Sequence, residues 1–209
     1  KIDCWLTRIN ESKLSGVIKT WIVDNVIVSR LSWSLLIYDF APAVVQNWQA
    51  MLIRCYKRWL KVSHCAETSI FCRDRKDFGV GLKDLEVENK CFNVVKWHLL
   101  KYSLDDQMRS LYLDKLRREQ AGKLGRGRKA ADAPAMNIER LEDEIKFRDK
   151  FGIKQVSGSG IGFGRFQSKP YQQSSNSEKR QLLTTQIRNE AENKRILVLM
   201  QYKMQNGFL

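Results

Sequence analysis

The chain has 209 residues, of which 43% are hydrophobic and 29% are charged. That length is enough for one sizeable hydrophobic core or two small ones. The 37 Lys and Arg residues outnumber the 23 Asp and Glu residues and give a formal net charge of +14. Such an excess favours a polyanionic partner, because each phosphate that is neutralised releases condensed counterions. Nucleic acid is the first expectation, and an acidic membrane surface or an acidic protein is the alternative.

Cysteine usage and hydropathy indicate an intracellular protein, nuclear or cytoplasmic. The five cysteines are odd in number, show no disulfide-framework spacing and follow no secretory signal. No membrane span is predicted, since no apolar stretch reaches about eighteen residues without a charge, and nucleic acid is preferred to a membrane as the partner. The most apolar tract, Val17 to Val28, contains Lys19 and Asp24. The chain begins with Lys1 rather than Met and opens within a pattern, so we expect a fragment of a longer polypeptide.

Helical periodicity dominates the first 120 residues. Apolar positions from about Ser12 to Ser29 form so wide a stripe that we expect this segment to be largely buried. A helix is predicted from Pro42 to Val62, with the proline in its first turn and with apolar residues along one side. Trp48 and Trp59 are expected to be core anchors. The other side carries four basic residues: Arg54, Lys57, Arg58 and Lys61.

Glycines and aspartates in the next part of the chain indicate where turns and helix ends fall. A short turn or hairpin is predicted near 69–82, and helical spacing then resumes as far as Tyr102. Asp105 and Asp106 indicate the start of a further helix, because carboxylates favour the positive end of the helix dipole. Ser103 is the predicted N-cap, and Asp106 follows it at the capping-box position.

The composition changes near Gln120, and 121–137 is predicted to be a flexible basic linker. Its Arg126, Arg128 and Lys129 are candidate contacts to a nucleic-acid backbone, and a solvated linker without such a role fits equally well. Asn137 is predicted to cap a short helix that ends at Lys150. The acidic run Glu142, Asp143 and Glu144 makes this helix unsuited to phosphate, so we expect it to pair with basic neighbours.

The stretch 151–177 is rich in Gly, Ser and Gln and is predicted to be a loop, followed by a terminal helix from about Glu178 to Gln205. Its alternating glycines match neither the dinucleotide fingerprint nor the phosphate loop. Phe163 and Phe166 could stack on bases of a single strand while Arg165 contacts phosphate. An ordinary flexible loop is the alternative.

No metal or nucleophile site is predicted. The candidate soft ligands lack the short Cys and His pairs from which zinc sites are built. Cys65 follows His64, yet no third residue that would orient the pair can be named. His98 lies between Trp97 and Leu99 and is expected in the core or at its boundary. The soft ligands considered were His64, Cys65, Cys72, Cys91 and His98.

Four stretches together resemble a known protein family. They are W-S-L-L-I-Y-D-F-A-P and its continuation to Leu60, S-I-F-C-R-D-R at 69–75, F-G-V-G-L-K at 78–83 and V-K-W-H-L-L at 95–100. They are similar to the thumb of reverse transcriptases from non-long-terminal-repeat retrotransposons, over roughly residues 10–150. The resemblance implies that the helix from Pro42 to Val62 grips the template-primer duplex. The implied partners are RNA–DNA hybrid or duplex nucleic acid and the upstream palm and fingers of the same polyprotein.

The motifs that resemble this family include none of its catalytic ones. A polymerase of this kind holds two metals on one aspartate from an early strand and a consecutive pair in a Tyr/Phe-x-Asp-Asp hairpin. Asp105 and Asp106 do not fit that hairpin, so no catalytic residue, metal ligand or cofactor is expected. Magnesium is implied only for the missing polymerase core.

The expected fold is therefore mainly α. A helical, thumb-like domain should occupy 1–120, and a C-terminal extension should occupy 138–209. The expected function is nucleic-acid binding as a non-catalytic part of an RNA-directed DNA polymerase. A decayed or domesticated remnant that binds RNA or DNA is one alternative. A helical adaptor that binds partner helices through 82–120 and 178–205 is the other.

Overall fold

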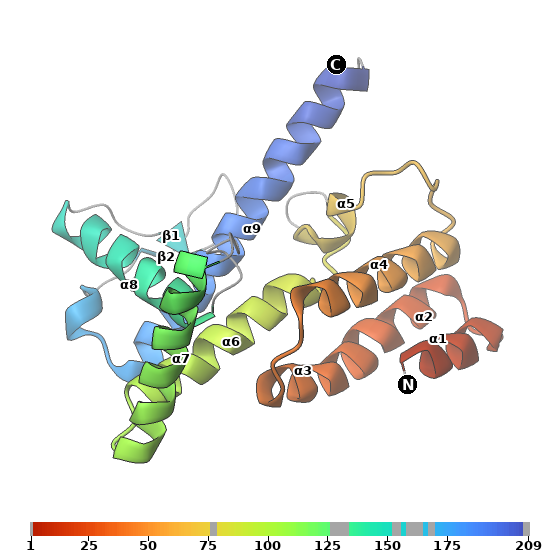
Figure 1. Ribbon diagram of the computed structural model, residues 1–209. Helices are drawn as coiled ribbons and strands as arrows, with labels where there is room; N and C mark the ends of the chain where they lie inside the picture. The colour runs from red at the N-terminus through yellow and green to blue at the C-terminus, as the bar shows by residue number, and fades with distance from the viewer. Residues whose placement is uncertain are drawn as a thin grey trace. The chain divides into compact units, whose positions relative to one another are not determined.

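The computed structural model describes residues 2–75, 79–125, 134–151, 156–157, 165–166 and 170–206, and this part of the chain is mainly helical, as predicted (Figure 1). The elements in chain order are α1 (Ile2–Glu11), α2 (Gly16–Ile22), the π-helical η1 (Val23–Ile27), α3 (Val28–Ile37), α4 (Pro42–Trp59), α5 (Ser69–Cys72), α6 (Leu85–Lys101), α7 (Asp106–Gly125), α8 (Pro134–Lys150), β1 (Val156–Ser157), β2 (Arg165–Phe166), the 3₁₀-helical η4 (Tyr171–Gln173) and α9 (Asn176–Asn206).

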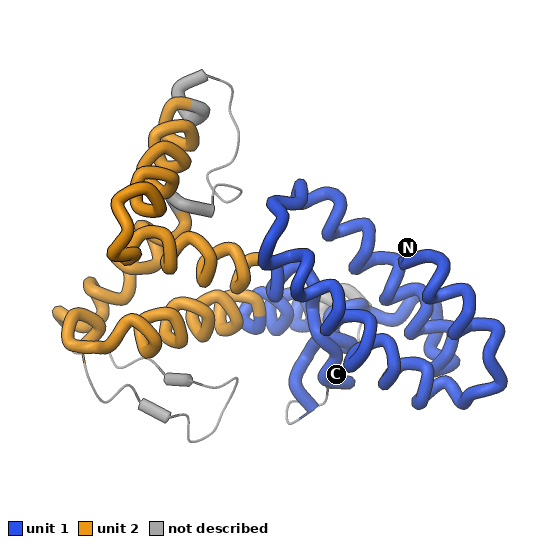
Figure 2. Tube along the Cα trace, turned by 90° about the horizontal axis from the view of Figure 1, so that it is seen from below, with its two compact units in different colours: residues 1–89, 192–209 blue, residues 90–191 orange. Residues whose placement is uncertain are grey.

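The chain divides into two compact units, coloured separately in Figure 2. The first unit comprises residues 1–89 and 192–209, and the second comprises residues 90–191. The division falls inside α6 and inside α9, so the C-terminal part of α9 belongs to the first unit. These ranges differ from the predicted 1–120 and 138–209, which were drawn where the composition changes.

In the first unit, α2, η1 and α3 form one continuous helical run that is buried along one side only. Val23, Ile27 and Leu31 lie on the buried side, where the run packs on α1 and α4. The prediction that this segment is largely buried is wrong, because Val17 and Trp21 on the opposite side face solvent. The periodicity identified the helix correctly, but the width of the apolar stripe did not measure its burial.

Helix α4 begins at Pro42, in the first turn as predicted. Proline is tolerated there because its missing N–H would have no helical acceptor. The inner side of α4 buries Val45, Leu52 and Tyr56. Gln49 is also buried, and its amide oxygen accepts a hydrogen bond from the Leu85 backbone N–H at 3.0 Å.

The predicted turn or hairpin near 69–82 contains the one-turn helix α5 and a later segment that hydrogen-bonds back to it. The Val80 N–H donates to the Ile70 carbonyl at 3.0 Å, and the Leu82 N–H donates to the Phe71 carbonyl at 2.9 Å. Gly81 adopts a φ of 75°, a left-handed conformation that glycine reaches without steric cost. Phe71 is buried, so this corner is held by its side chain as well as by the backbone.

The second unit has its own hydrophobic core. Helix α8 contributes Ile138, Leu141 and Ile145, and α9 contributes Leu183 and Ile187, all of them buried. The acidic α8 also pairs with basic residues, as predicted. Its ion pairs include Glu142 with Lys101 at 2.9 Å and Asp143 with Lys146 at 3.5 Å.

The predicted helix start at Asp105 and Asp106 is confirmed, with a different cap. The Asp105 carboxylate accepts from the Gln107 N–H at 2.8 Å, so Asp105 is the N-cap and Asp106 is the first helical residue. The Ser103 hydroxyl, which was expected to cap the helix, instead accepts from the Asp105 N–H at 3.2 Å.

Both ends of the predicted linker are helical. Helix α7 continues to Gly125, and α8 begins at Pro134, so the prediction that Asn137 caps a helix is wrong. Pro134 takes the first helical position, for which its fixed φ suits it. Residues 126–133 of the predicted linker lie outside the described part.

The stretch predicted as a loop over 151–177 contains short regular elements. Strands β1 and β2 pair antiparallel, with Val156 opposite Phe166. Helix α9 starts at Asn176, close to the prediction, through a reciprocal capping box. The Ser175 N–H donates to the Glu178 carboxylate at 2.7 Å, and the Ser175 hydroxyl accepts from the Glu178 N–H at 3.3 Å.

Candidate nucleic-acid interface

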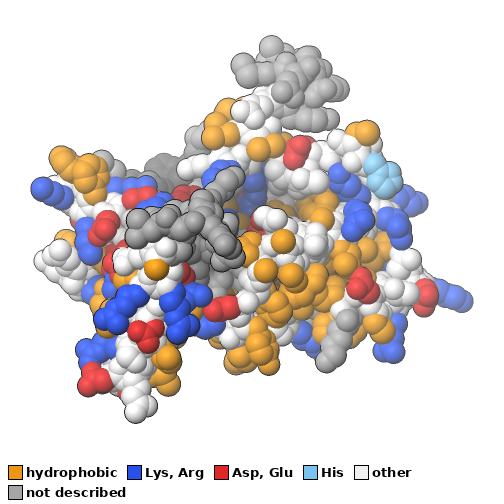
Figure 3. Space-filling view, viewed as in Figure 1, with side chains coloured by type: hydrophobic (Ala, Val, Ile, Leu, Met, Phe, Trp, Pro, Cys, Tyr) orange, Lys and Arg blue, Asp and Glu red, His pale blue; other side chains and the backbone are white. Residues whose placement is uncertain are grey.

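The C-terminal end of α4 presents three of the four basic residues predicted on this helix. Arg54 and Arg58 are exposed four residues apart, on one side of α4, and Lys61 is exposed just beyond the end of the helix. No carboxylate in the described part of the chain forms an ion pair with these three cations. In Figure 3, Lys and Arg side chains gather over this end of α4.

Lys57 is the fourth predicted contact, and the structure contradicts that prediction. The residue is 7% exposed, and its ammonium group donates to the carbonyl oxygens of His64 at 2.8 Å and Ala66 at 2.6 Å. The chain after α4 folds back over Lys57, which helical spacing alone did not reveal. Lys57 therefore anchors this loop and is not available to phosphate.

Lys61 is exposed, but its backbone conformation also affects what a substitution at this position would do. It lies just beyond α4 with a φ of 55°, in the left-handed region. The Val62 N–H donates to the Lys57 carbonyl at 2.9 Å, and the Lys61 N–H donates to the Arg58 carbonyl at 3.3 Å. These are the two bonds of a Schellman motif, whose left-handed position favours Gly or Asn. A substitution at Lys61 therefore changes backbone strain as well as charge.

Trp59 holds this end of α4 against the preceding helices. Its indole N–H donates to the Asn10 side-chain oxygen at 3.0 Å, and its ring centroid lies 6.3 Å from that of Tyr56. The prediction that Trp59 is a core anchor is confirmed by its burial. Trp48 is half-buried, with the Phe40 ring 5.1 Å away.

The local electrostatics agree with an exposed positive edge. Burial raises the pKa of the Cys55 thiol, and Arg58 and Arg54 partly oppose this rise through their charges. Cys55 therefore stays protonated at neutral pH between the two arginines. Arg58 also lies in the last turn of α4, where a cation offsets the negative end of the helix dipole.

The other predicted contacts are only partly placed. Arg126, Arg128, Lys129 and Phe163 lie outside the described residues. Arg165 and Phe166 are described as backbone only, in β2, where Arg165 pairs with Ser157. The roles predicted for all six side chains stay predictions.

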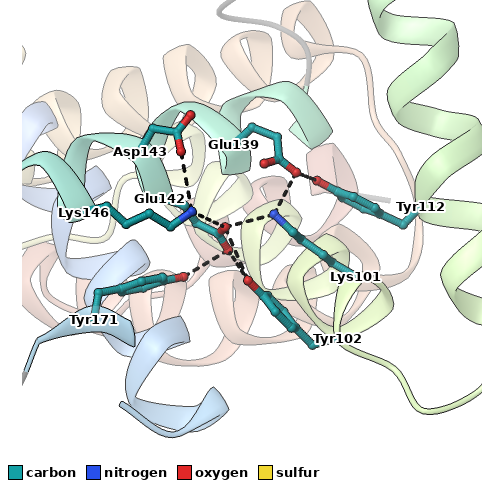
Figure 4. A network of polar contacts seen from close by, with 8 residues as sticks. All are labelled: Lys101, Tyr102, Tyr112, Glu139, Glu142, Asp143, Lys146 and Tyr171. Atoms are coloured by element: carbon teal, nitrogen blue, oxygen red, sulfur yellow. Dashed lines mark hydrogen bonds and ion pairs between the residues drawn. The ribbon is translucent and has the colours of Figure 1, made fainter. Parts of the chain in front are cut away.

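Sequence analysis did not anticipate a buried polar network in the second unit (Figure 4). Glu142 is 1% exposed, and its carboxylate accepts from the Lys101 ammonium at 2.9 Å. It also accepts from the hydroxyls of Tyr102 at 3.1 Å and Tyr171 at 3.0 Å. The acidic run in α8 signalled the carboxylate, but nothing in the sequence placed distant tyrosines around it.

Glu139 extends this network and shares its lysine. Its carboxylate accepts from Lys101 at 2.7 Å and from the Tyr112 hydroxyl at 2.6 Å. Burial alone would raise the pKa of Glu139, but the bonds from Lys101 and Tyr112 lower it overall. Burial lowers the pKa of Lys101, and the two carboxylates more than compensate, so it is raised. An ammonium group held between two carboxylates is a structural arrangement, and no reaction is needed to account for it.

His98 is fully buried, as its neighbours in the sequence predicted. Neither ring nitrogen forms a hydrogen bond within the described part of the chain. Burial lowers the pKa of His98 to about 4, with the positive charge of Arg180 acting in the same direction and Glu142 opposing. The ring lies 4.6 Å from that of Tyr102. His98 is therefore neutral at pH 7.

The soft-ligand residues do not converge in the described part of the chain, where no three His, Cys, Asp or Glu side chains are placed to hold a metal ion. The Cys72 thiol accepts a hydrogen bond from Gln49 at 3.2 Å. Burial, together with the charge of Asp84, raises the pKa of Cys72 to about 12. His64 and Cys65 are exposed.

No protein-family model, curated protein or solved structure matches this chain. Among the described helices, none combines the length and the apolar character needed to cross a bilayer.

Proposed function

We propose that this chain is a non-catalytic, nucleic-acid-binding part of a reverse transcriptase. In this proposal the C-terminal end of α4 grips the backbone of the template-primer duplex, with Arg54, Arg58 and Lys61 at the phosphates. The single observation that supports it best is that these three cations are exposed at the C-terminal end of α4 and have no carboxylate partner in the described part. The net charge of +14 and the resemblance to retrotransposon thumbs support it further.

Other cations of the chain differ from these three because they form ion pairs with carboxylates. Arg140 pairs with Glu144, Lys146 pairs with Asp143, and Arg195 pairs with Asp84 at 2.6 Å. Such cations already balance protein carboxylates and would have to give up these contacts to bind phosphate. Arg54 and Arg58 are four residues apart, or about 6 Å along the helix axis, so both can follow one backbone strand.

The test is the salt dependence of binding to RNA–DNA hybrid and to duplex DNA. The charge-removal variant combines Arg54→Gln, Arg58→Gln and Lys61→Asn and leaves the buried Lys57 intact. Asparagine is chosen at position 61 because it tolerates the left-handed backbone. The matched control combines Lys90→Gln, Lys150→Gln and Lys194→Gln, which are exposed elsewhere. Each variant loses three charges, so the net charge falls from +14 to +11 in both.

We expect the α4 variant to flatten the slope of log K against log salt by about 2 to 3, since each phosphate contact contributes about 0.9 on B-form DNA. The control should weaken binding slightly and keep the slope of the parent chain. Equal slopes for the α4 variant and the parent would contradict the grip on α4. Strong preference for one sequence would contradict backbone recognition.

A helical adaptor is the second candidate, and one feature of α7 favours it. Met108 and Leu111 are exposed three residues apart on α7, a spacing by which a helix face can be read in a groove, and Leu104 is exposed just before the helix begins. Arg109 and Arg117 are also exposed on this helix, and both pair with nearby aspartates. If neither the substitutions on α4 nor substitutions at Lys123, Arg126, Arg128 and Lys129 affect nucleic-acid binding, the exposed apolar surface of α7 becomes the better candidate for function.

A further inference from the structure

The continuous helix formed by α2, η1 and α3 carries a solvent-facing row of apolar side chains. Trp21 is 60% exposed and Trp33 is 70% exposed, although both are large and apolar. We name this row the tryptophan stripe; its members are Val17, Ile18, Trp21, Val26, Trp33 and Ile37. Exposed tryptophans are typical of interaction hot spots.

The π-helical segment brings the two tryptophans onto one side of the helix. Residues twelve apart in an uninterrupted α-helix, at about 100° per residue, would point about 120° away from each other. Within Val23–Ile27 the bonds run from residue i to i+5, and the smaller turn of about 80° per residue removes most of that offset. The burial pattern agrees, because Val23, Ile27 and Leu31 are buried on the opposite side.

The stripe is large enough for a specific interface. Its six side chains expose roughly 700 Å² of apolar surface, close to the about 800 Å² per partner of a standard interface. The largest apolar patch on a typical monomer is only about 300–600 Å². Asn25 and Ser29 are also exposed between the tryptophans, so the stripe has two apolar ends with polar residues between them, and its total area, rather than its continuity, suits a partner.

Four of the six stripe residues are placed symmetrically about Ile27. Trp21 and Trp33 lie six residues on either side of Ile27, and Val17 and Ile37 lie ten residues on either side. A two-fold axis at this point, with the helices antiparallel, sets Trp21 of one copy against Trp33 of the other. Such self-complementarity is what an isologous dimer requires.

The charges of this helix also permit a second copy despite the net charge of +14. Lys19 and Asp24 are buried, and Arg30 is the one exposed charge in this run of described residues. The Arg30 guanidinium lies 6.0 Å from the centre of the Trp5 ring, beside the stripe. In the antiparallel arrangement the two Arg30 residues are displaced by six residues, about 9 Å along the axis, so they do not meet.

We propose that the tryptophan stripe is a homodimer interface, in which two copies of this helix pack antiparallel about a two-fold axis near Ile27. The apolar stripe supplies the association free energy, and the π-helical segment supplies the alignment. The proposal does not depend on nucleic-acid binding, because the stripe and the basic end of α4 are different surfaces.

Sedimentation equilibrium on the full chain, freed of nucleic acid by nuclease treatment, tests the proposal. We expect a monomer–dimer equilibrium that added salt strengthens, because salt screens the repulsion between two positive copies. Association through bound nucleic acid would instead weaken with salt and disappear after nuclease treatment. A chain that stays monomeric at micromolar concentrations and high salt overturns the proposal and leaves the stripe to a different protein.

Two charge variants test the register. Trp21→Lys and Trp33→Glu should each raise the dissociation constant at least about thirty-fold, the effect of losing an interface hot spot. Mixed together they should dimerise, because the antiparallel register sets Lys at 21 against Glu at 33 and retains the other tryptophan pair. Leu113→Lys, at an exposed apolar position on α7, is the control and should dimerise like the parent chain. Folded single variants that dimerise normally, or a mixture that does not, would overturn the proposed interface.

Discussion

At the scale of single residues, Glu142 is the most consequential polar side chain of the second unit. It is 1% exposed and accepts hydrogen bonds from Lys101, Tyr102 and Tyr171. Glu142→Ala leaves the two hydroxyls and part of the ammonium group without their acceptor. Because breaking a buried pair by removing one partner costs about 3–5 kcal/mol, we expect a loss near the lower end, as Glu139 still holds Lys101.

Urea denaturation measures this loss, with Asp143→Ala as the matched control. Asp143 is the next residue of α8, its side chain is 73% exposed, and its ion pair with Lys146 should contribute less than about 1 kcal/mol. Equal effects of the two substitutions would show that the network in Figure 4 does not stabilise the fold.

His98 gives the stability a defined pH dependence. Its pKa is about 4 in the folded chain and 6.5 in the reference state, so between these values the unfolded chain binds a proton that the folded chain does not. The contribution of neutral His98 to the free energy of unfolding is therefore fully present above pH 6.5 and is lost as the pH falls towards 4. The shift corresponds to at most about 3 kcal/mol.

His98→Leu should remove this dependence and retain the stability at pH 7, because neither imidazole nitrogen has a hydrogen-bond partner in the described part of the chain. Thermal denaturation between pH 4 and pH 7 gives the comparison. Substituting the exposed His64 should leave the profile unchanged. A pH profile of His98→Leu that matches the parent chain would show that other groups cause the acid sensitivity.

At the scale of elements, the close approach of α2 to α4 depends on Gly16. A Cβ atom at this position would lie 1.9 Å from the Trp59 carbonyl oxygen, so the two helices would have to move apart. A Gly→Ala change inside a helix ordinarily stabilises by up to about 1 kcal/mol. Here we expect the opposite sign, a loss of about 1–3 kcal/mol typical of overpacking.

Urea denaturation of Gly16→Ala decides the sign. Ser29→Ala, on the exposed side of α3, is the control for helix propensity and should be neutral or slightly stabilising. Stabilisation by Gly16→Ala would mean that α2 and α4 are not in close contact in solution.

The same elements show what the sequence can predict. Periodicity and caps are local, so α4, the helix start at Asp106 and the terminal helix were predicted from residues close in sequence. Lys57 was misassigned because its partners, the carbonyls of His64 and Ala66, belong to a loop whose path no local pattern encodes. The exposure of Trp21 was missed for a similar reason, since burial depends on how many neighbours a helix has. Hydrophobicity alone does not report that number.

At the scale of the whole molecule, the positive charge is unevenly divided. Residues 1–89 with 192–209 carry 16 basic and 11 acidic residues, or +5, and residues 90–191 carry 21 and 12, or +9. The proposed grip on α4 therefore lies in the less positive unit. Charge density and binding need not coincide, because cations that pair with carboxylates attract phosphate less than cations without such partners.

Because the second unit is the more positive, the basic stretch from Lys123 to Lys129, at and beyond the end of α7, is the critical comparison for the proposed function. Changing Lys123, Arg126, Arg128 and Lys129 to glutamine lowers the net charge from +14 to +10, one charge more than the α4 variant removes. If α4 grips the duplex, these four changes should reduce affinity mainly through long-range attraction and flatten the salt slope by less than the α4 variant. Fluorescence anisotropy with duplex DNA and RNA–DNA hybrid, across a salt series, measures both slopes. A larger flattening from the four changes than from the α4 variant would transfer the binding element to this stretch, because contact ions, and not distant charges, set the slope.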